Sequence, residues 1–174
     1  MDPATVILVV CFGLLGVGIY WAIKTDPEAA AASVDPTIKV CEIPAVFAAL
    51  KGSTGEVAFA VFVFNSPDGS TNEDALNIQF SIEDGIVGFD WCLVTRPNID
   101  DAGKFVAYSE RRGYTVEEKE MNGVQYHRVE TGDLASLCGG VATDMYGLST
   151  MDRLTLIAEG FRFDPTSGQS TDAA

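Results

Sequence analysis

Three residues in this sequence, Asp90, Cys92 and His127, have side chains that could work together as a catalytic group. Asp90 and Cys92 occupy one predicted strand, and His127, the single histidine of the chain, occupies another. An imidazole beside a thiol can accept the thiol proton and so create a nucleophile. However, the residues around Cys92 match no catalytic signature, and no oxyanion hole can be assigned. A small enzyme or ligand-binding domain that uses Cys92, His127 and Asp90 is therefore the alternative hypothesis.

Aromatic side chains accompany these residues on the same two predicted strands. Phe89 and Trp91 lie on the first strand, and Tyr126 and His127 lie on the second. Aromatic residues on a sheet are typical of domains that stack RNA bases, but residues 124–130 lack the basic, glycine-containing pattern of such strands. Large aromatic side chains more commonly belong to a core. As binding residues, these four would form the wall of a hydrophobic groove for a partner peptide.

The sequence predicts no metal site and no cofactor. Four oxygen-bearing side chains alternate along one predicted loop as calcium ligands do, namely Asp68, Ser70, Asn72 and Asp74. Glu73 replaces the glycine that a calcium loop needs after its third ligand, and Gln79 replaces the bidentate glutamate. No two cysteines have the C-x-x-C spacing of zinc or redox sites. A glycine-rich phosphate loop is also missing from the sequence.

Acidic residues dominate the charge of the chain. There are 25 aspartates and glutamates against 11 lysines and arginines, which gives a formal net charge of −14. Such a field repels phosphate backbones, so we do not expect nucleic acid as a partner. It also disfavours broad adsorption of the folded domain onto anionic lipid headgroups.

Residues 4–23 form the longest apolar stretch and contain no charged side chain. About twenty such residues suffice for a helix to cross a bilayer, so we predict a single transmembrane helix in contact with lipid. Tyr20, Trp21 and Lys24 suit the membrane interface at its carboxyl end. By the positive-inside rule, Lys24 places the following domain in the cytoplasm. A signal peptide cleaved near residues 29–32 and a buried core helix are the competing interpretations.

The rest of the chain predicts a linker over residues 24–37, an α+β domain over 38–163 and a polar, disordered tail over 164–174. Periodicity and turn signals predict helices at 44–51, 99–112 and 131–146, and strands at 56–65, 77–82, 88–94, 114–120, 124–130 and 153–161. From residue 86 onward this is the order of the ferredoxin-like split βαβ unit. We therefore expect a ferredoxin-like antiparallel sheet of five or six strands, extended by two earlier strands and a short helix, with helices on one face.

These features together favour a non-enzymatic function. One anchor, a short tether and a compact domain without a catalytic pattern predict a membrane-anchored protein-interaction module of adaptor or regulatory type. Its sheet face or sheet edge would bind a protein partner close to the membrane. An accessory subunit of a membrane complex is a further alternative, because Gly16, Gly18 and Ala22 would permit close packing of the anchor against another helix.

Overall fold

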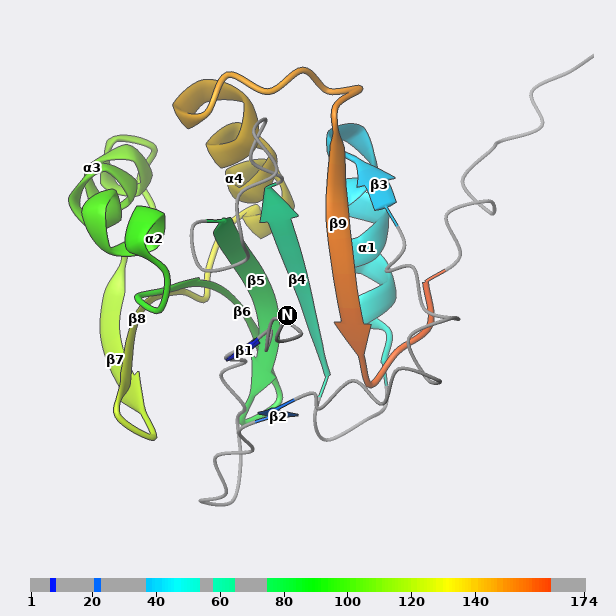
Figure 1. Cartoon of the computed structure of the whole chain (residues 1–174), viewed down its shortest axis with the longest axis horizontal. Helices are drawn as coiled ribbons and strands as arrows, with labels where there is room; N and C mark the ends of the chain where they lie inside the picture. Colours follow the sequence, from blue (N-terminus) through cyan, green and yellow to red (C-terminus); the bar gives the residue numbers. More distant parts are fainter. Residues whose placement is uncertain (1–6, 9–20, 23–36, 54–57, 65–74, 164–174) are drawn as a thin grey trace, which may run out of the picture.

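The computed structural model describes residues 7–8, 21–22, 37–53, 58–64 and 75–163. Its main body is a seven-stranded sheet with the strand order β3-β9-β4-β5-β6-β8-β7 (Figure 1). Every neighbouring pair in this sheet is antiparallel. The strands are β3 (Thr37–Lys39), β4 (Phe59–Phe64), β5 (Leu76–Glu83), β6 (Ile86–Cys92), β7 (Glu117–Met121), β8 (Val124–Val129) and β9 (Arg153–Glu159).

Helices pack on one face of this sheet, which we call the helix face, and the opposite side is called the second face. The longer helices are α1 (Ile43–Lys51), α3 (Ala102–Arg111) and α4 (Leu134–Gly140). Shorter helical segments are η1 (Val40–Glu42), α2 (Arg96–Asp100) and the π-helical η3 (Val141–Met145), which continues α4. Predicted helix 99–112 is thus divided into α2 and α3. Its expected cap, Asn98, is buried within α2 and bonds the backbone of Asn77 through both its side-chain oxygen and nitrogen.

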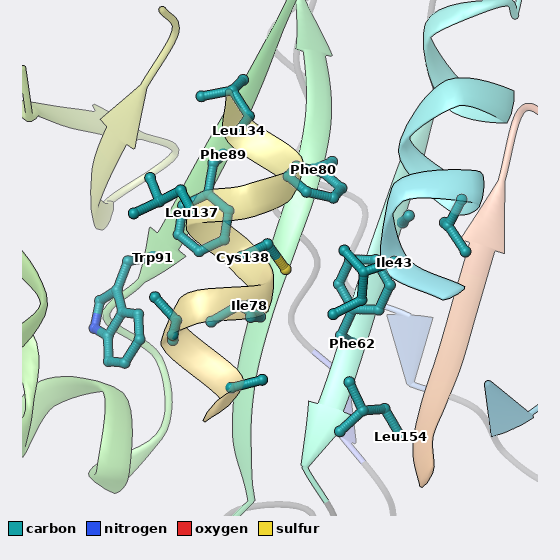
Figure 2. Close-up of a cluster of buried hydrophobic side chains, with 14 of the residues drawn as sticks. Ile43, Phe62, Ile78, Phe80, Phe89, Trp91, Leu134, Leu137, Cys138 and Leu154 are labelled. Atoms are coloured by element: carbon teal, nitrogen blue, oxygen red, sulfur yellow. The ribbon is translucent and has the colours of Figure 1, made fainter. Parts of the chain in front are cut away.

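Strand alternation explains the core on the helix face. Along β5, apolar Leu76, Ile78 and Phe80 belong to the core cluster, whereas the residues between them are polar. Figure 2 shows Phe62, Ile78, Phe80 and Phe89 from neighbouring strands, with side chains of α4 lying over this part of the sheet. Rings of α1, β4, β5, β6 and α3 form a chain of contacts through the pairs Phe47–Phe80, Phe62–Phe80, Phe80–Phe89 and Phe89–Phe105. Burial of this apolar surface is the main driving force of the fold.

The ferredoxin-like prediction is wrong in its sheet order. The expected neighbours β6, β8 and β7 do lie in that order, but β9 should then lie next to β6. Instead, the β4–β5 hairpin separates them, and β9 pairs with β4 and β3. The reason lies in β4, whose residues on both faces, including Phe59, Val61 and Phe62, are buried. A strand that is apolar on both faces belongs in the middle of a sheet.

The predicted transmembrane helix over residues 4–23 is also contradicted. Within that stretch the structure describes two short strands, β1 (Ile7–Leu8) and β2 (Trp21–Ala22), which pair in antiparallel register. Across the part of the chain that the structure describes, no helix has both the length and the apolar character to cross a membrane. The single-pass membrane assignment and the cytoplasmic placement derived from it are therefore corrected. An uncharged run rich in valine and isoleucine satisfies strand preferences as well as helical ones, so length and hydropathy alone do not distinguish a helix from strands here.

Several other predictions lie outside the described residues. These are most of the linker over 24–37, the tail over 164–174 and the loop that contains Asp68, Ser70, Asn72 and Asp74.

Candidate functional site

The sheet places the predicted catalytic residues on opposite faces. In the register of β6 and β8, Trp91 lies opposite His127, Cys92 lies opposite Tyr126, and Asp90 lies opposite Arg128. Directly paired residues share a face, and successive residues alternate. His127 therefore lies on the helix face with Trp91, whereas Asp90 and Cys92 lie on the second face. The sheet itself separates the imidazole from the thiol, so the structure does not bring the three predicted groups together.

The four candidate binding residues are divided in the same way. Phe89 and Trp91 are fully buried on the helix face, and the Trp91 ring stacks on Phe105 at 4.8 Å between centroids. Tyr126 is buried on the second face, and its hydroxyl donates a hydrogen bond to Glu83. His127 and Tyr126 line a surface hollow, whereas Phe89 and Trp91 belong to the buried core cluster. A single aromatic wall, as predicted from the sequence, is therefore not formed.

A buried polar network around Arg128 occupies the second face. The Arg128 guanidinium is completely buried and donates to Asp90 at 2.6 Å, Ser81 at 2.9 Å and Glu130 at 2.7 Å. It also donates to the backbone carbonyl of Ile86 at 3.0 Å. Charge-assisted bonds of this kind are roughly twice as strong as neutral ones. The network ties β5, β6 and β8 together and leaves the guanidinium fully engaged with its own chain.

Burial and charge shift the carboxylates of this network in different directions. Burial raises the pKa of Asp90, and the Arg128 charge only partly offsets that effect. Burial and the neighbouring Asp90 charge raise the pKa of Glu83. By contrast, hydrogen bonds from Lys119 and Arg128 lower the pKa of Glu130. Glu130 is therefore the member of this network whose ionised form the fold stabilises.

Glu130→Gln should reduce the acid sensitivity of the fold. The lowered pKa of Glu130 means that its stabilising effect is present above its unfolded value of 4.5 and is lost as pH falls through the folded value. Urea unfolding from about pH 6 to about pH 3 measures how the free energy of unfolding depends on pH. The slopes of the parent chain and of Glu130→Gln should differ by at most about 1.4 kcal/mol per pH unit. Glu118→Gln, on the exposed side of the same hairpin, is the matched control. An unchanged slope in Glu130→Gln would contradict the assignment.

A surface groove runs along the β7–β8 hairpin beside α2, and we call it the hairpin groove. One part, of about 300 Å³, is lined by Leu93, Glu118, Lys119, Glu120, Gln125, Tyr126 and His127. The adjoining part, of about 330 Å³, is lined by Leu93, Ile99, Glu120, Gly123, Val124 and Gln125. The two parts share Leu93, Glu120 and Gln125, so they form one continuous surface feature.

The hairpin groove combines apolar and acidic side chains. Ile99 is 56 % exposed, one of the few large apolar side chains that the described part of the chain leaves at the surface, and Leu93 is half-buried beside it. Glu118 and Glu120 are exposed at the rim. Within the described residues, no basic side chain forms an ion pair with either glutamate. The groove therefore offers an apolar surface flanked by two uncompensated negative charges.

A second hollow, between α3 and η3, has most of its charges paired internally. Tyr108 and Arg112 both donate to Asp144, at 3.0 and 2.6 Å. Tyr146 and Lys104 both donate to Asp101. These bonds hold η3 and the following Tyr146 against α3 and the preceding Asp101. Among the charged side chains that line this hollow, Arg111 is the one that forms no ion pair within the described residues. Among the described residues, no group of three or more histidine, cysteine or acidic side chains is placed to hold a metal ion.

Comparison with known protein families, with curated proteins and with solved structures finds no significant match for this chain. The sequence analysis missed Leu93, Ile99, Glu118 and Glu120 as site residues. The available signal was the acidic stretch over residues 117–120, followed by an Asn-Gly turn, because such a stretch forms a strand whose side chains stay in solvent.

Proposed function

We propose that this chain is a protein-interaction module that binds a partner segment with apolar and basic side chains in the hairpin groove. The observation that carries the proposal is the pairing of exposed Ile99 and half-buried Leu93 with the uncompensated carboxylates of Glu118 and Glu120. An apolar side chain of the partner, or the aliphatic stem of a basic one, would pack on Ile99 and Leu93. Lysine or arginine side chains beside it would approach the two glutamates.

The charge of the whole chain supports a basic partner. A net charge of −14 attracts cationic segments over a distance and raises their rate of association. The same field repels acidic competitors, so the groove would discriminate by charge as well as by shape. The separation of Cys92 from His127 across the sheet favours binding over nucleophilic catalysis as the function of this region.

A peptide titration tests the proposal directly. The probe is a twelve-residue synthetic peptide in which arginine alternates with leucine and valine, and its counterpart carries glutamate in place of arginine. With the full chain, we expect calorimetry to detect binding of the arginine peptide only. We also expect its affinity to fall as salt is raised, because the Glu118 and Glu120 charges at the rim are exposed and screened.

Ile99→Asp should weaken binding of the arginine peptide at least about tenfold, because a buried isoleucine contact is worth about 1.5–3 kcal/mol. Met151→Asp is the matched control, since Met151 is 59 % exposed but does not line the groove. Equal affinities of the two variants, or equal binding of both peptides, would overturn the proposal.

A further inference from the structure

The outer edge of β7 has backbone groups that its own sheet does not use. β7 is the last strand of the sheet on this side. It is joined to β8 by a two-residue turn in which Asn122 has φ 54° and Gly123 has φ 80°. Such turns close on a hydrogen-bonded pair, here Met121 with Val124, and hydrogen-bonded pairs then alternate along the ladder. Lys119 and Glu117 therefore bond to β8, whereas the backbone groups of Glu118 and Glu120 point outward.

An independent contact on the other side of β8 supports this alternation. The Leu93 amide donates to the carbonyl of Gln125 at 2.9 Å, so the Gln125 backbone is turned toward the end of β6. Gln125 is the cross-strand partner of Glu120. In a pair of this type both backbones point away from each other. The amide and carbonyl of Glu120 must then face the outer edge.

We propose that the partner segment binds in extended form, adds to the outer edge of β7 as a further strand, and carries basic side chains at alternate positions. This inference rests on the proposed function and names the geometry of that partner. The backbone of the added strand would bond the outward amides and carbonyls of Glu118 and Glu120. Side chains of an added strand alternate with period two. Every second one would therefore lie on the helix face, where a basic group reaches the Glu118 and Glu120 carboxylates and its aliphatic stem packs toward Leu93 and Ile99.

Charge favours a basic partner segment over a second copy of this chain at the outer edge of β7. Basic side chains across from Glu118 and Glu120 form favourable cross-strand pairs, whereas a second β7 would set glutamate beside glutamate. Two copies of a chain with a charge of −14 also repel each other. The opposite edge of the sheet, β3, has only three residues. Of the two edge strands in the described sheet, the acidic strand β7 is therefore the longer one.

A proline substitution at position 120 tests whether the partner binds through backbone hydrogen bonds or only through the charge of the Glu120 side chain. Glu120→Pro removes an outward amide but none of the bonds to β8, and proline is tolerated at such edge positions. Glu120→Gln removes the same charge and keeps the amide, so it is the matched control. We expect Glu120→Pro to bind the alternating arginine peptide at least about tenfold more weakly than Glu120→Gln. Thermal unfolding of both variants checks that the hairpin remains folded.

Peptide N-methylation tests the same edge with an unaltered protein. One version of the arginine peptide is methylated on the amides that would face β7, and the other on the alternate set. We expect only one set of methyl groups to abolish binding. Equal effects of the two sets, or equal affinities of Glu120→Pro and Glu120→Gln, would overturn strand addition. If Ile99→Asp still weakened binding in that case, the groove function would stand and only its geometry would fail. Sedimentation of a Glu120-dependent dimer without peptide would instead identify a second copy as the occupant and overturn the inference.

Discussion

Replacement of Arg128 by methionine is expected to lower the free energy of unfolding by about 3–5 kcal/mol, the range for removing one partner of a buried ion pair. The effect is large because the substitution leaves the buried Asp90 carboxylate without its cationic partner. Asp90 is completely buried, and its carboxylate accepts from Arg128 at 2.6 Å. Without the guanidinium, that charge has only the Ser81 hydroxyl and the Gln79 amide as partners. Urea unfolding followed by circular dichroism measures the loss.

The matched control is the double variant Asp90→Asn with Arg128→Met. It removes the second buried charge, so we expect it to be more stable than Arg128→Met alone even though it carries one further substitution. A loss below about 1 kcal/mol in Arg128→Met would place the pair in the class of exposed ion pairs and contradict its burial.

Gly88 explains how the arginine reaches its partners. A Cβ atom at this position would lie 2.2 Å from Cζ of Arg128, because the side chain crosses β6 directly over the glycine. Glycine in a strand interior commonly marks such a close approach. Gly88→Ala should therefore destabilise the protein mainly by displacing Arg128. Its effect is then expected to be smaller in an Arg128→Met background, and a double-mutant cycle measures that difference.

Local elements of the fold were predictable because their signals are local. The Asn122-Gly123 pair predicted the β7–β8 hairpin, and both residues adopt the positive φ that its turn requires. Asp84 and Gly85 have the same geometry between β5 and β6, where a hairpin was predicted as well. In both cases a few adjacent residues determine the backbone path. The alternation of the flanking strands then determines which side chains reach the core.

The sheet order and the site could not be predicted in the same way. The position of β9 beside β4 depends on pairing between residues about ninety-five positions apart, such as Phe62 with Leu156. A charged residue between His127 and Val129 indicates solvent exposure, but Arg128 is buried because Gly88, Asp90 and Ser81 meet it from two other strands. The hairpin groove likewise requires Leu93 and Ile99 to approach the β7–β8 hairpin, which no local pattern specifies.

Trp91→Ala is the second large effect that we expect, a loss of about 3–5 kcal/mol in the free energy of unfolding. Trp91 is fully buried, stacks on Phe105 and donates from its indole nitrogen to the carbonyl of Asn98 at 2.8 Å. Figure 2 includes its ring in the cluster of buried hydrophobic side chains. The substitution therefore leaves a cavity and also removes a buried hydrogen bond to the Asn98 carbonyl.

The same variant distinguishes the two roles that the sequence left open for this tryptophan. A core residue loses stability on truncation, whereas an exposed binding residue loses affinity. We expect folded Trp91→Ala, measured at low temperature where its native fraction is high, to bind the arginine peptide within about twofold of the parent chain. Trp91→Phe is the control, because it keeps an aromatic ring against Phe105 and should lose less stability. A stable Trp91→Ala variant that no longer binds would place the site in the sheet and not in the hairpin groove.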